Sequence, residues 1–317
     1  MCGIAGIFGF NRQQKIDRDL VQMIPGRGSK EKTQRLLEIS DLVVVTGSQN
    51  NVKRAYTCGT PAVAVGAGNV TVIVDETADL AEAATKIKAS KTFDNATSCS
   101  SENAVVVLDE IFEAFMAEVA KTGGALVSDE AAIKARLWPD GHLNRAVIAQ
   151  DAPAMIEALG LRDQVPAGTE YIAVETTGIG PEHPLSGEKL SRVLALYRAR
   201  DFEEAMAITR RIQLHMGAGH SVGLHSRDDA RAVALANAIP TCRVIVNQAH
   251  CFATGGAFNN GMPFSLSMGC GSWGGNSIDD NLNWKHFLQT TKIVREIPPV
   301  EPSLDDIFGG YWAESAE

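Results

Sequence analysis

The residues best suited to chemistry lie in one segment, residues 92 to 103, where Cys99 stands among small polar side chains. Residues 78 to 91 before it show helical spacing of apolar side chains, and the apolar run 104 to 108 after it is typical of a buried strand. This order predicts that Cys99 lies on a helix-to-strand loop, a common position for catalytic groups. A thiolate there could attack a carbonyl carbon. The alternative is a small residue in a connector, because free cysteine is most often a buried small hydrophobe.

Strand and helix patterns alternate along the chain, which predicts an α/β fold. We expect strands over 42–45 and 61–65 with a helix over 48–56 between them, and a further helix over 110–121. The first turn of that βαβ unit is Thr46-Gly47-Ser48. A glycine and a hydroxyl at a helix N-terminus can bind a phosphate.

Several blocks of this chain, in order over residues 30 to 317, resemble the aldehyde dehydrogenase superfamily and in particular its CoA-acylating branch. The blocks are the Cys99 loop, Gly59-Thr60-Pro61-Ala62-Val63-Ala64-Val65-Gly66-Ala67-Gly68-Asn69, His183-Pro184-Leu185-Ser186-Gly187-Glu188-Lys189-Leu190, Gly219-His220-Ser221, and residues 247 to 277. The resemblance implies an aldehyde dehydrogenase-like catalytic domain with a truncated Rossmann-like cofactor domain. It also implies oxidation of a small aldehyde by NAD or NADP with coenzyme A as co-substrate, in a homo-oligomer.

The same resemblance assigns roles to residues. Cys99 would be the nucleophile, forming a thiohemiacetal and then an acyl thioester, so the loop must favour its thiolate, for which backbone N–H groups are one means. Thr46, Gly47, Ser48 and Gly66 would contact the cofactor. Glu175 would touch the nicotinamide ribose, although a surface glutamate at a strand end is the alternative.

Substrate contacts are expected from Asn95, Asn247, His250 and Gly271, although asparagines are also common in turns. Residues 247–250 and 268–276 are most similar to branch members that act on sulfoacetaldehyde, with enzymes for acetaldehyde and succinate semialdehyde as near relatives. Gly269, Gly271 and Gly274 match G-x-G-x-x-G, but they lie near the C-terminus rather than early in a βαβ unit. We interpret them as a substrate-pocket loop.

One absence favours CoA over water as the acyl acceptor. Hydrolytic members of the family place a glutamate base in the strand that matches Val63-Ala64-Val65, where this chain has only apolar side chains. Without that base the thioester would survive until CoA arrives.

Composition excludes several classes of protein. The net charge of −9 argues against nucleic-acid and anionic-membrane partners, and no apolar run reaches the ~20 residues of a membrane span. The six cysteines show no paired spacing, and the histidines show no zinc-site spacing, so we expect reduced thiols and no metal. These features predict a cytoplasmic enzyme.

The chain is expected to divide into an anomalous segment 1–13, a partial cofactor domain 14–69, a catalytic domain 70–295 and a tail 296–317. Residues 1 to 10 resemble the start of class II glutamine amidotransferases, with Cys2 as nucleophile, but no room remains for that domain's glutamine pocket. The family's first cofactor-domain strands and its oxyanion asparagine have no counterpart here. The alternative function is therefore an impaired family member that acts only as a folded or oligomerising domain.

Overall fold

The computed structural model describes residues 4–6, 21–24 and 26–315, and Cys2 lies outside them. The chain divides into two compact units, Met1–Asn283 and Trp284–Glu317. Within the first unit we call residues 70–283 the large lobe and residues 30–65 the small lobe. The expected cofactor segment does not separate as a unit, and the second unit begins at Trp284 rather than at residue 296.

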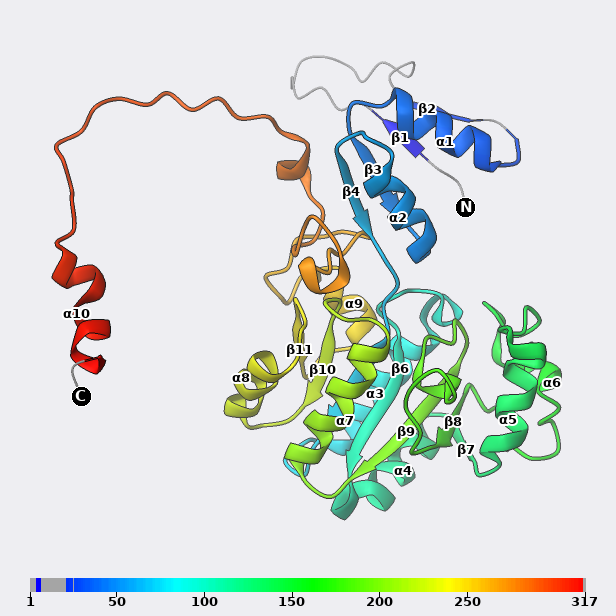
Figure 1. Cartoon of the computed structure of the whole chain (residues 1–317). Coiled ribbons are helices and arrows are strands. Elements are labelled where there is room, and N and C mark those ends of the chain that lie inside the picture. Colours follow the sequence, from blue (N-terminus) through cyan, green and yellow to red (C-terminus); the bar gives the residue numbers. More distant parts are fainter. Residues whose placement is uncertain (1–3, 7–20, 25, 316–317) are drawn as a thin grey trace. The chain divides into compact units, whose positions relative to one another are not determined.

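The large lobe is built on a seven-stranded parallel sheet in the order β11-β10-β5-β6-β9-β8-β7 (Figure 1). The strands are β5 (Val70–Val74), β6 (Glu102–Leu108), β7 (Gly124–Val127), β8 (Tyr171–Glu175), β9 (Val193–Ala199), β10 (Val222–His225) and β11 (Val244–Val246). The helices are α3 (Leu80–Thr92), α4 (Phe112–Lys121), α5 (Glu130–Leu137), α6 (Ala152–Ala158), α7 (Phe202–His215), α8 (Asp229–Ala238) and α9 (His250–Thr254). This architecture confirms the predicted α/β class.

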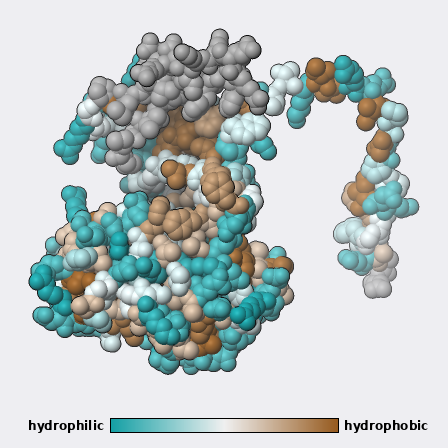
Figure 2. Space-filling model, turned by 180° about the vertical axis from the view of Figure 1, so that it is seen from behind, coloured by the Kyte–Doolittle hydropathy of each residue, from teal (hydrophilic) through white to brown (hydrophobic). Residues whose placement is uncertain are grey.

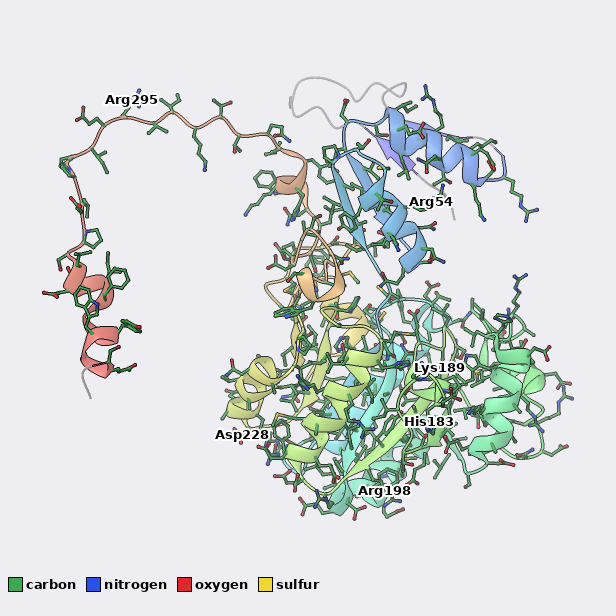
Figure 3. All side chains as sticks on the ribbon, in the orientation of Figure 1. Arg54, His183, Lys189, Arg198, Asp228 and Arg295 are labelled. Carbon is green, nitrogen blue, oxygen red and sulfur yellow. The ribbon has the colours of Figure 1, made fainter. Side chains whose placement is uncertain are left out.

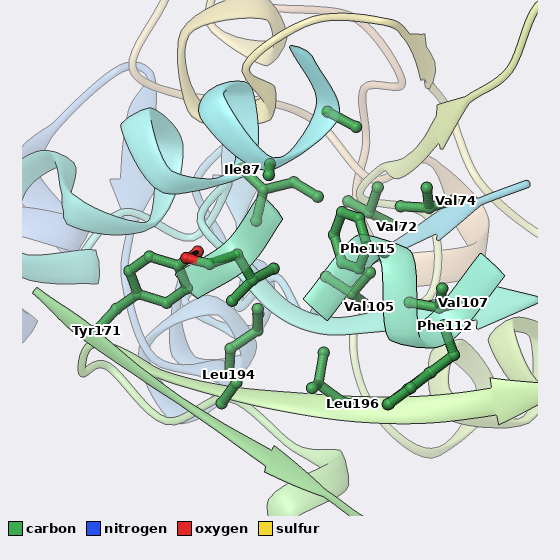
Figure 4. Packing of buried hydrophobic residues seen from close by; sticks show 14 of the residues in the cluster. Val72, Val74, Ile87, Val105, Val107, Phe112, Phe115, Tyr171, Leu194 and Leu196 are labelled. Carbon is green, nitrogen blue, oxygen red and sulfur yellow. Dashed lines mark hydrogen bonds between the residues drawn. The ribbon is translucent and has the colours of Figure 1, made fainter. Parts of the chain in front are cut away.

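Helices cover this sheet, so its strands are apolar on both faces. Every residue of β5 and β6 is buried. On one face, Phe112 and Phe115 of α4 pack with Val105 and Leu196 of the central strands (Figure 4). The Cys99 loop therefore leads directly into a central, fully enclosed strand.

The small lobe contains α1 (Lys30–Ile39), β3 (Val43–Thr46), α2 (Gln49–Thr57) and β4 (Ala62–Val65). β3 and β4 form a two-stranded parallel sheet, and β1 (Ile4–Gly6) pairs with β2 (Val21–Met23) in an antiparallel ladder. The small core includes Leu37, Val52 and Ala55. Ile39 is 58% exposed and Val44 is 40% exposed. Figure 2 shows hydrophobic residues, in brown, at several places on the surface of the protein.

The second unit ends in helix α10 (Leu304–Glu314). Ser303 and Asp306 form a capping box at its start, each side chain bonding the other residue's backbone N–H. None of the helix's residues is buried. Among the described residues, no helix has the length and apolar character required to cross a membrane.

Candidate active site

Cys99 lies between α3 and β6, as predicted from the sequence. Three consecutive residues before it, Asp94, Asn95 and Ala96, have φ angles of 48°, 50° and 60°. Such left-handed conformations cost free energy for non-glycine residues and persist where the surroundings fix them. The Thr97 hydroxyl donates to the backbone oxygen of Asp94 over 2.7 Å. The loop is therefore held in a specific, strained shape just before the thiol.

The Cys99 thiol contacts the imidazole of His220. His220 Nε2 lies 3.3 Å from Cys99 Sγ, although the two residues are 121 positions apart. Gly68 permits this approach, because a Cβ at that position would collide with the carbonyl oxygen of Cys99 and lie 3.1 Å from His220 Cδ2. A cysteine and a histidine at hydrogen-bond distance form the basic arrangement of an activated thiol.

The polar chain continues behind His220. His220 Nδ1 lies 2.7 Å from Ser221 Oγ, and the same oxygen lies 2.8 Å from His250 Nε2. All three side chains are buried. Cys99, His220, Ser221 and His250 thus form one continuous series of contacts that runs from the thiol into the protein.

Cys99 opens onto a cleft of about 570 Å³ between the two lobes of the first unit. The lining residues come from both lobes: Thr46, Gly47, Ser48, Gly66, Ala67, Phe93, Thr97, Ser98, Cys99, Ser100, Glu188, Leu190, Cys251, Gly255, Ser265, Leu266 and Met268. The cleft is large enough for a drug-sized ligand. It therefore joins the predicted nucleophile to the predicted phosphate-binding turn.

Glu188, rather than Glu175, supplies a carboxylate to this cleft. The next residue, Lys189, is fully buried; its Nζ donates to the carbonyl oxygens of Leu185 and Gly187 over 2.6 and 2.9 Å. Its backbone N–H donates to Asn103 Oδ1 over 3.0 Å. These bonds fix the loop that carries Glu188, whose pKa burial raises to about 7.

Glu175 lies elsewhere. Its carboxylate accepts from Arg198 Nε over 2.8 Å, and Arg198 also contacts Asp109 and Glu113. Figure 3 labels Arg198 at the lower edge of the unit, well below Lys189. The structure thus does not bring Glu175 to the cleft with Cys99, and its surroundings match the surface alternative.

Burial raises the pKa of the Cys99 thiol to about 12, and the nearby Glu188 carboxylate acts in the same direction. Burial also lowers the pKa of His220 to about 3, so this imidazole is neutral at physiological pH. A backbone hydrogen bond at Cys99 lowers the thiol pKa, as expected of the loop, but burial outweighs it, so activation of the thiol by the loop stays a prediction. A thiolate here needs a hydrogen-bond donor or a change in the cleft.

The predicted substrate residues do not gather around the thiol. Asn95 accepts from Arg192 Nη2 over 2.7 Å and donates to Ala149 O over 3.0 Å. Asn247 bonds the backbone of Ser226 and lines a smaller hollow with His225 instead. Gly271 has φ +57° and is outside the cleft lining. His250 is buried and is linked to Cys99 only through Ser221 and His220.

The predicted cofactor residues do line the cleft. Thr46, Gly47 and Ser48 connect β3 to the N-terminus of α2, and Gly66 follows β4. Ser48 is the N-cap of α2, yet its side chain makes no capping hydrogen bond. The first backbone N–H groups of the helix therefore remain available to a phosphate, so this turn fits the pyrophosphate of a dinucleotide. β3 has only β4 as a strand neighbour among the described residues.

His220 and Glu188 are the site residues that sequence reasoning missed. Both lie within blocks of the family resemblance, but no role was attached to them. A lone histidine between Gly219 and Ser221 has no periodicity that points to a cysteine so distant in the chain. Gly68 offered a weak signal, since an isolated glycine can mark a close backbone approach.

Residues 6–134 match the model of the aldehyde dehydrogenase family. This chain carries an aldehyde dehydrogenase family domain. It is 50% identical over 297 residues to sulfoacetaldehyde dehydrogenase (acylating) from Cupriavidus necator, a match that covers 93% of this chain and 60% of that protein. An enzyme of the same name from Bilophila wadsworthia is 38% identical over 303 residues, covering 93% of this chain and 64% of the relative.

Solved structures agree with this aldehyde dehydrogenase assignment. The acetylating aldehyde dehydrogenase from Geobacillus thermoglucosidasius superposes with a TM-score of 0.83 at 32% identity, covering 90% of this chain and 64% of that one. The present chain thus spans 60–64% of the length of these three relatives.

Proposed function

We propose that this chain carries the acyl-transfer centre of a CoA-acylating aldehyde dehydrogenase, with Cys99 as nucleophile. The observation that carries the proposal is the 3.3 Å contact between Cys99 Sγ and His220 Nε2 at the wall of a two-lobed cleft. A half-buried thiol beside a neutral imidazole suits covalent catalysis better than metal or phosphate chemistry. The relatives at 38–50% identity carry the same activity in their names.

The chemistry follows from the thiol. The Cys99 thiolate adds to the aldehyde carbon, forming a C–S bond and a thiohemiacetal oxyanion. Loss of a hydride from that carbon leaves an acyl thioester on Cys99. The thiolate of CoA then attacks the thioester carbonyl, the new S–C bond forms, and Cys99 departs as a thiolate.

NAD or NADP, when bound, supplies the hydride acceptor. Thr46, Gly47, Ser48 and the N-terminus of α2 would hold its pyrophosphate, and Gly66 lines the same side of the cleft. Glu188 is the carboxylate of the cleft and takes the cofactor-side role first expected of Glu175.

Sulfoacetaldehyde is the substrate we propose. Neither lysine nor arginine lines the cleft in the described part of the chain, so the hydroxyls of residues such as Ser98 and Ser265 would bind the sulfonate. Hydroxyl groups can donate to a singly charged sulfonate without an ion pair.

The test is CoA-dependent reduction of NAD or NADP with sulfoacetaldehyde, acetaldehyde and succinate semialdehyde. We expect the highest kcat/KM with sulfoacetaldehyde, complete loss in Cys99→Ala, and retention in the control Cys58→Ala. Ser265→Ala should lower the preference for sulfoacetaldehyde over acetaldehyde. Activity that survives in Cys99→Ala would refute the mechanism, whereas a preference for acetaldehyde would refute only the substrate.

We also propose a homo-oligomer in the cytoplasm. The half-exposed apolar side chains of Ile39 and Val44 favour association. The five described cysteines are free, which suits a reducing compartment. Light scattering of the purified chain and fractionation of expressing cells would test these two points.

A further inference from the structure

The hydroxyl of Ser221 lies between two imidazoles, and this limits how protons can be arranged at the active site. Its oxygen is 2.7 Å from His220 Nδ1 and 2.8 Å from His250 Nε2. A serine has one proton, so it can donate to only one of these nitrogens. The other ring must donate its own N–H to the serine oxygen.

Two neutral arrangements satisfy that condition. In the first, His220 donates from Nδ1 and Ser221 donates to His250 Nε2, which leaves a lone pair on His220 Nε2 and places the His250 proton on Nδ1. In the second, His250 donates from Nε2 and Ser221 donates to His220 Nδ1. The second arrangement puts the His220 proton on Nε2, where it faces Cys99 Sγ at 3.3 Å.

The surroundings of His250 favour the second arrangement. His250 Nδ1 is buried and has no hydrogen-bond partner among the described residues. The first arrangement would leave a buried N–H donor unpaired there, and orphaned buried N–H groups are rare in proteins. The second arrangement leaves only a lone pair without a partner on His250 Nδ1, and it is therefore favoured.

We propose that Ser221 and His250 are positioning residues that hold His220 in the Nε2–H tautomer, so that an N–H donor faces the sulfur of Cys99. The donor would stabilise the Cys99 thiolate both when it attacks the aldehyde and when it departs from the thioester. The mechanistic role rests on the proposed function, but the tautomer itself does not.

The other charged and titratable groups around the thiol do not replace this donor. The Glu188 carboxylate raises the pKa of Cys99 through its negative charge, and the thiols of Cys251 and Cys270 act in the same direction only where they ionise. Arg243 is near, but its Nη1 donates to the backbone oxygens of His220 and Gly269 over 3.0 and 2.8 Å. Its guanidinium therefore stabilises the backbone at His220 and does not donate to the sulfur of Cys99.

The direct test is long-range ¹⁵N–¹H NMR of the full chain with labelled histidine near pH 8. Protonated and unprotonated ring nitrogens have well-separated shifts, and His220→Asn and His250→Asn spectra assign them. We expect His220 protonated at Nε2 and His250 protonated at Nε2. Protonation of His220 at Nδ1, or comparable amounts of both tautomers, would overturn the proposal.

The second test measures iodoacetamide alkylation of Cys99 as a function of pH, with peptide mapping. Loss of one hydrogen bond in Ser221→Ala should slow alkylation about three- to tenfold at every pH below the thiol pKa, and Ser221→Thr should restore most of the rate. Ser191→Ala is the matched control, because Ser191 is a buried serine whose hydroxyl has no partner among the described residues. An unchanged rate in Ser221→Ala, or an equal loss in Ser191→Ala, would contradict the positioning role.

These tests do not require turnover, so they separate the two proposals. The expected tautomer in a protein that transfers no acyl group would refute the acylating function and leave the positioning proposal intact. The opposite tautomer in a protein that does transfer acyl groups would refute the positioning proposal and leave the acylating function intact.

Discussion

The two lobes beside the cleft differ in how completely they enclose their strands. The large lobe places seven parallel strands between helices, and every residue of β5 and β6 is buried. The small lobe has two parallel strands, and β3 alternates between buried and accessible residues. Parallel sheets are normally covered on both faces. The strand that follows Cys99 is thus fully enclosed, whereas the turn Thr46-Gly47-Ser48 follows a strand that is only partly covered.

A two-stranded sheet is marginal by itself, so the small lobe must depend on its contacts with the large one. Tyr56 contacts the large lobe through Ser277 and contacts β4 of the small lobe itself through Ala64. Its hydroxyl accepts from the backbone N–H groups of Ala64 and Ser277 over 3.0 and 2.8 Å. Thr46 Oγ1 also lies 2.7 Å from Ser267 Oγ. We therefore expect contacts with the large lobe to stabilise the turn Thr46-Gly47-Ser48.

The largest expected effect comes from the core of the large lobe. Phe115 is completely buried in the cluster shown in Figure 4. Phe115→Ala should lower the free energy of unfolding by about 3–5 kcal/mol, because it removes a large side chain and leaves a cavity. Urea unfolding followed by circular dichroism measures this, with exposed Phe258→Ala as the control. A loss below about 1 kcal/mol would mean that this core is not as tightly packed as described.

A fall in pH should destabilise the large lobe before the small lobe. No histidine occurs in residues 1–69, whereas burial lowers the pKa of His220 to about 3 and of His225 to about 4. The unfolded chain binds protons at these sites below its ordinary histidine pKa of about 6.5, while the folded protein does not. Stability is thus fully present above pH 6.5 and is lost as the pH falls toward 4.

Melting temperatures between pH 7.5 and 4.5 test this point. His225→Gln should make the decline in melting temperature with falling pH shallower than in the wild type. His142 is exposed, so His142→Gln should leave this decline unchanged. Equal slopes in all three proteins would show that other groups control the acid response.

A smaller effect is expected at the junction of the lobes. Tyr56→Phe should cost about 1–3 kcal/mol locally, because two backbone N–H groups lose their acceptor. Hydrogen exchange of residues 43–65 should then accelerate while exchange in β6 stays unchanged. Acceleration throughout the chain would instead indicate that the two lobes unfold as one cooperative unit.

Much of the fold could be predicted because strand and helix periods are local properties. The expected strands 42–45, 61–65 and 104–108 correspond to β3, β4 and β6, and the expected helices 48–56 and 78–91 correspond to α2 and α3. The position of Cys99 between a helix and a strand followed from the same patterns and is confirmed.

The rest of the site depends on contacts between distant segments. His220 meets Cys99 across 121 residues, and only the packing of β10 near β6 brings them together. Asn247 follows β11 and joins His225 in a separate hollow, which no local pattern could reveal. Glu175 ends β8 and pairs with Arg198, whereas Glu188, on a loop fixed by a buried lysine, reaches the cleft.

The most direct measurement asks whether the large lobe performs acyl transfer without a nucleotide. The purified chain would be incubated with acetyl-CoA in the absence of NAD and NADP, and intact mass and peptide mapping would follow. We expect the mass of one acetyl group on Cys99, no adduct in Cys99→Ala, and an undiminished adduct in Cys58→Ala. An unmodified Cys99, or an acetyl group carried by Cys251 or Cys270 instead, would contradict the account.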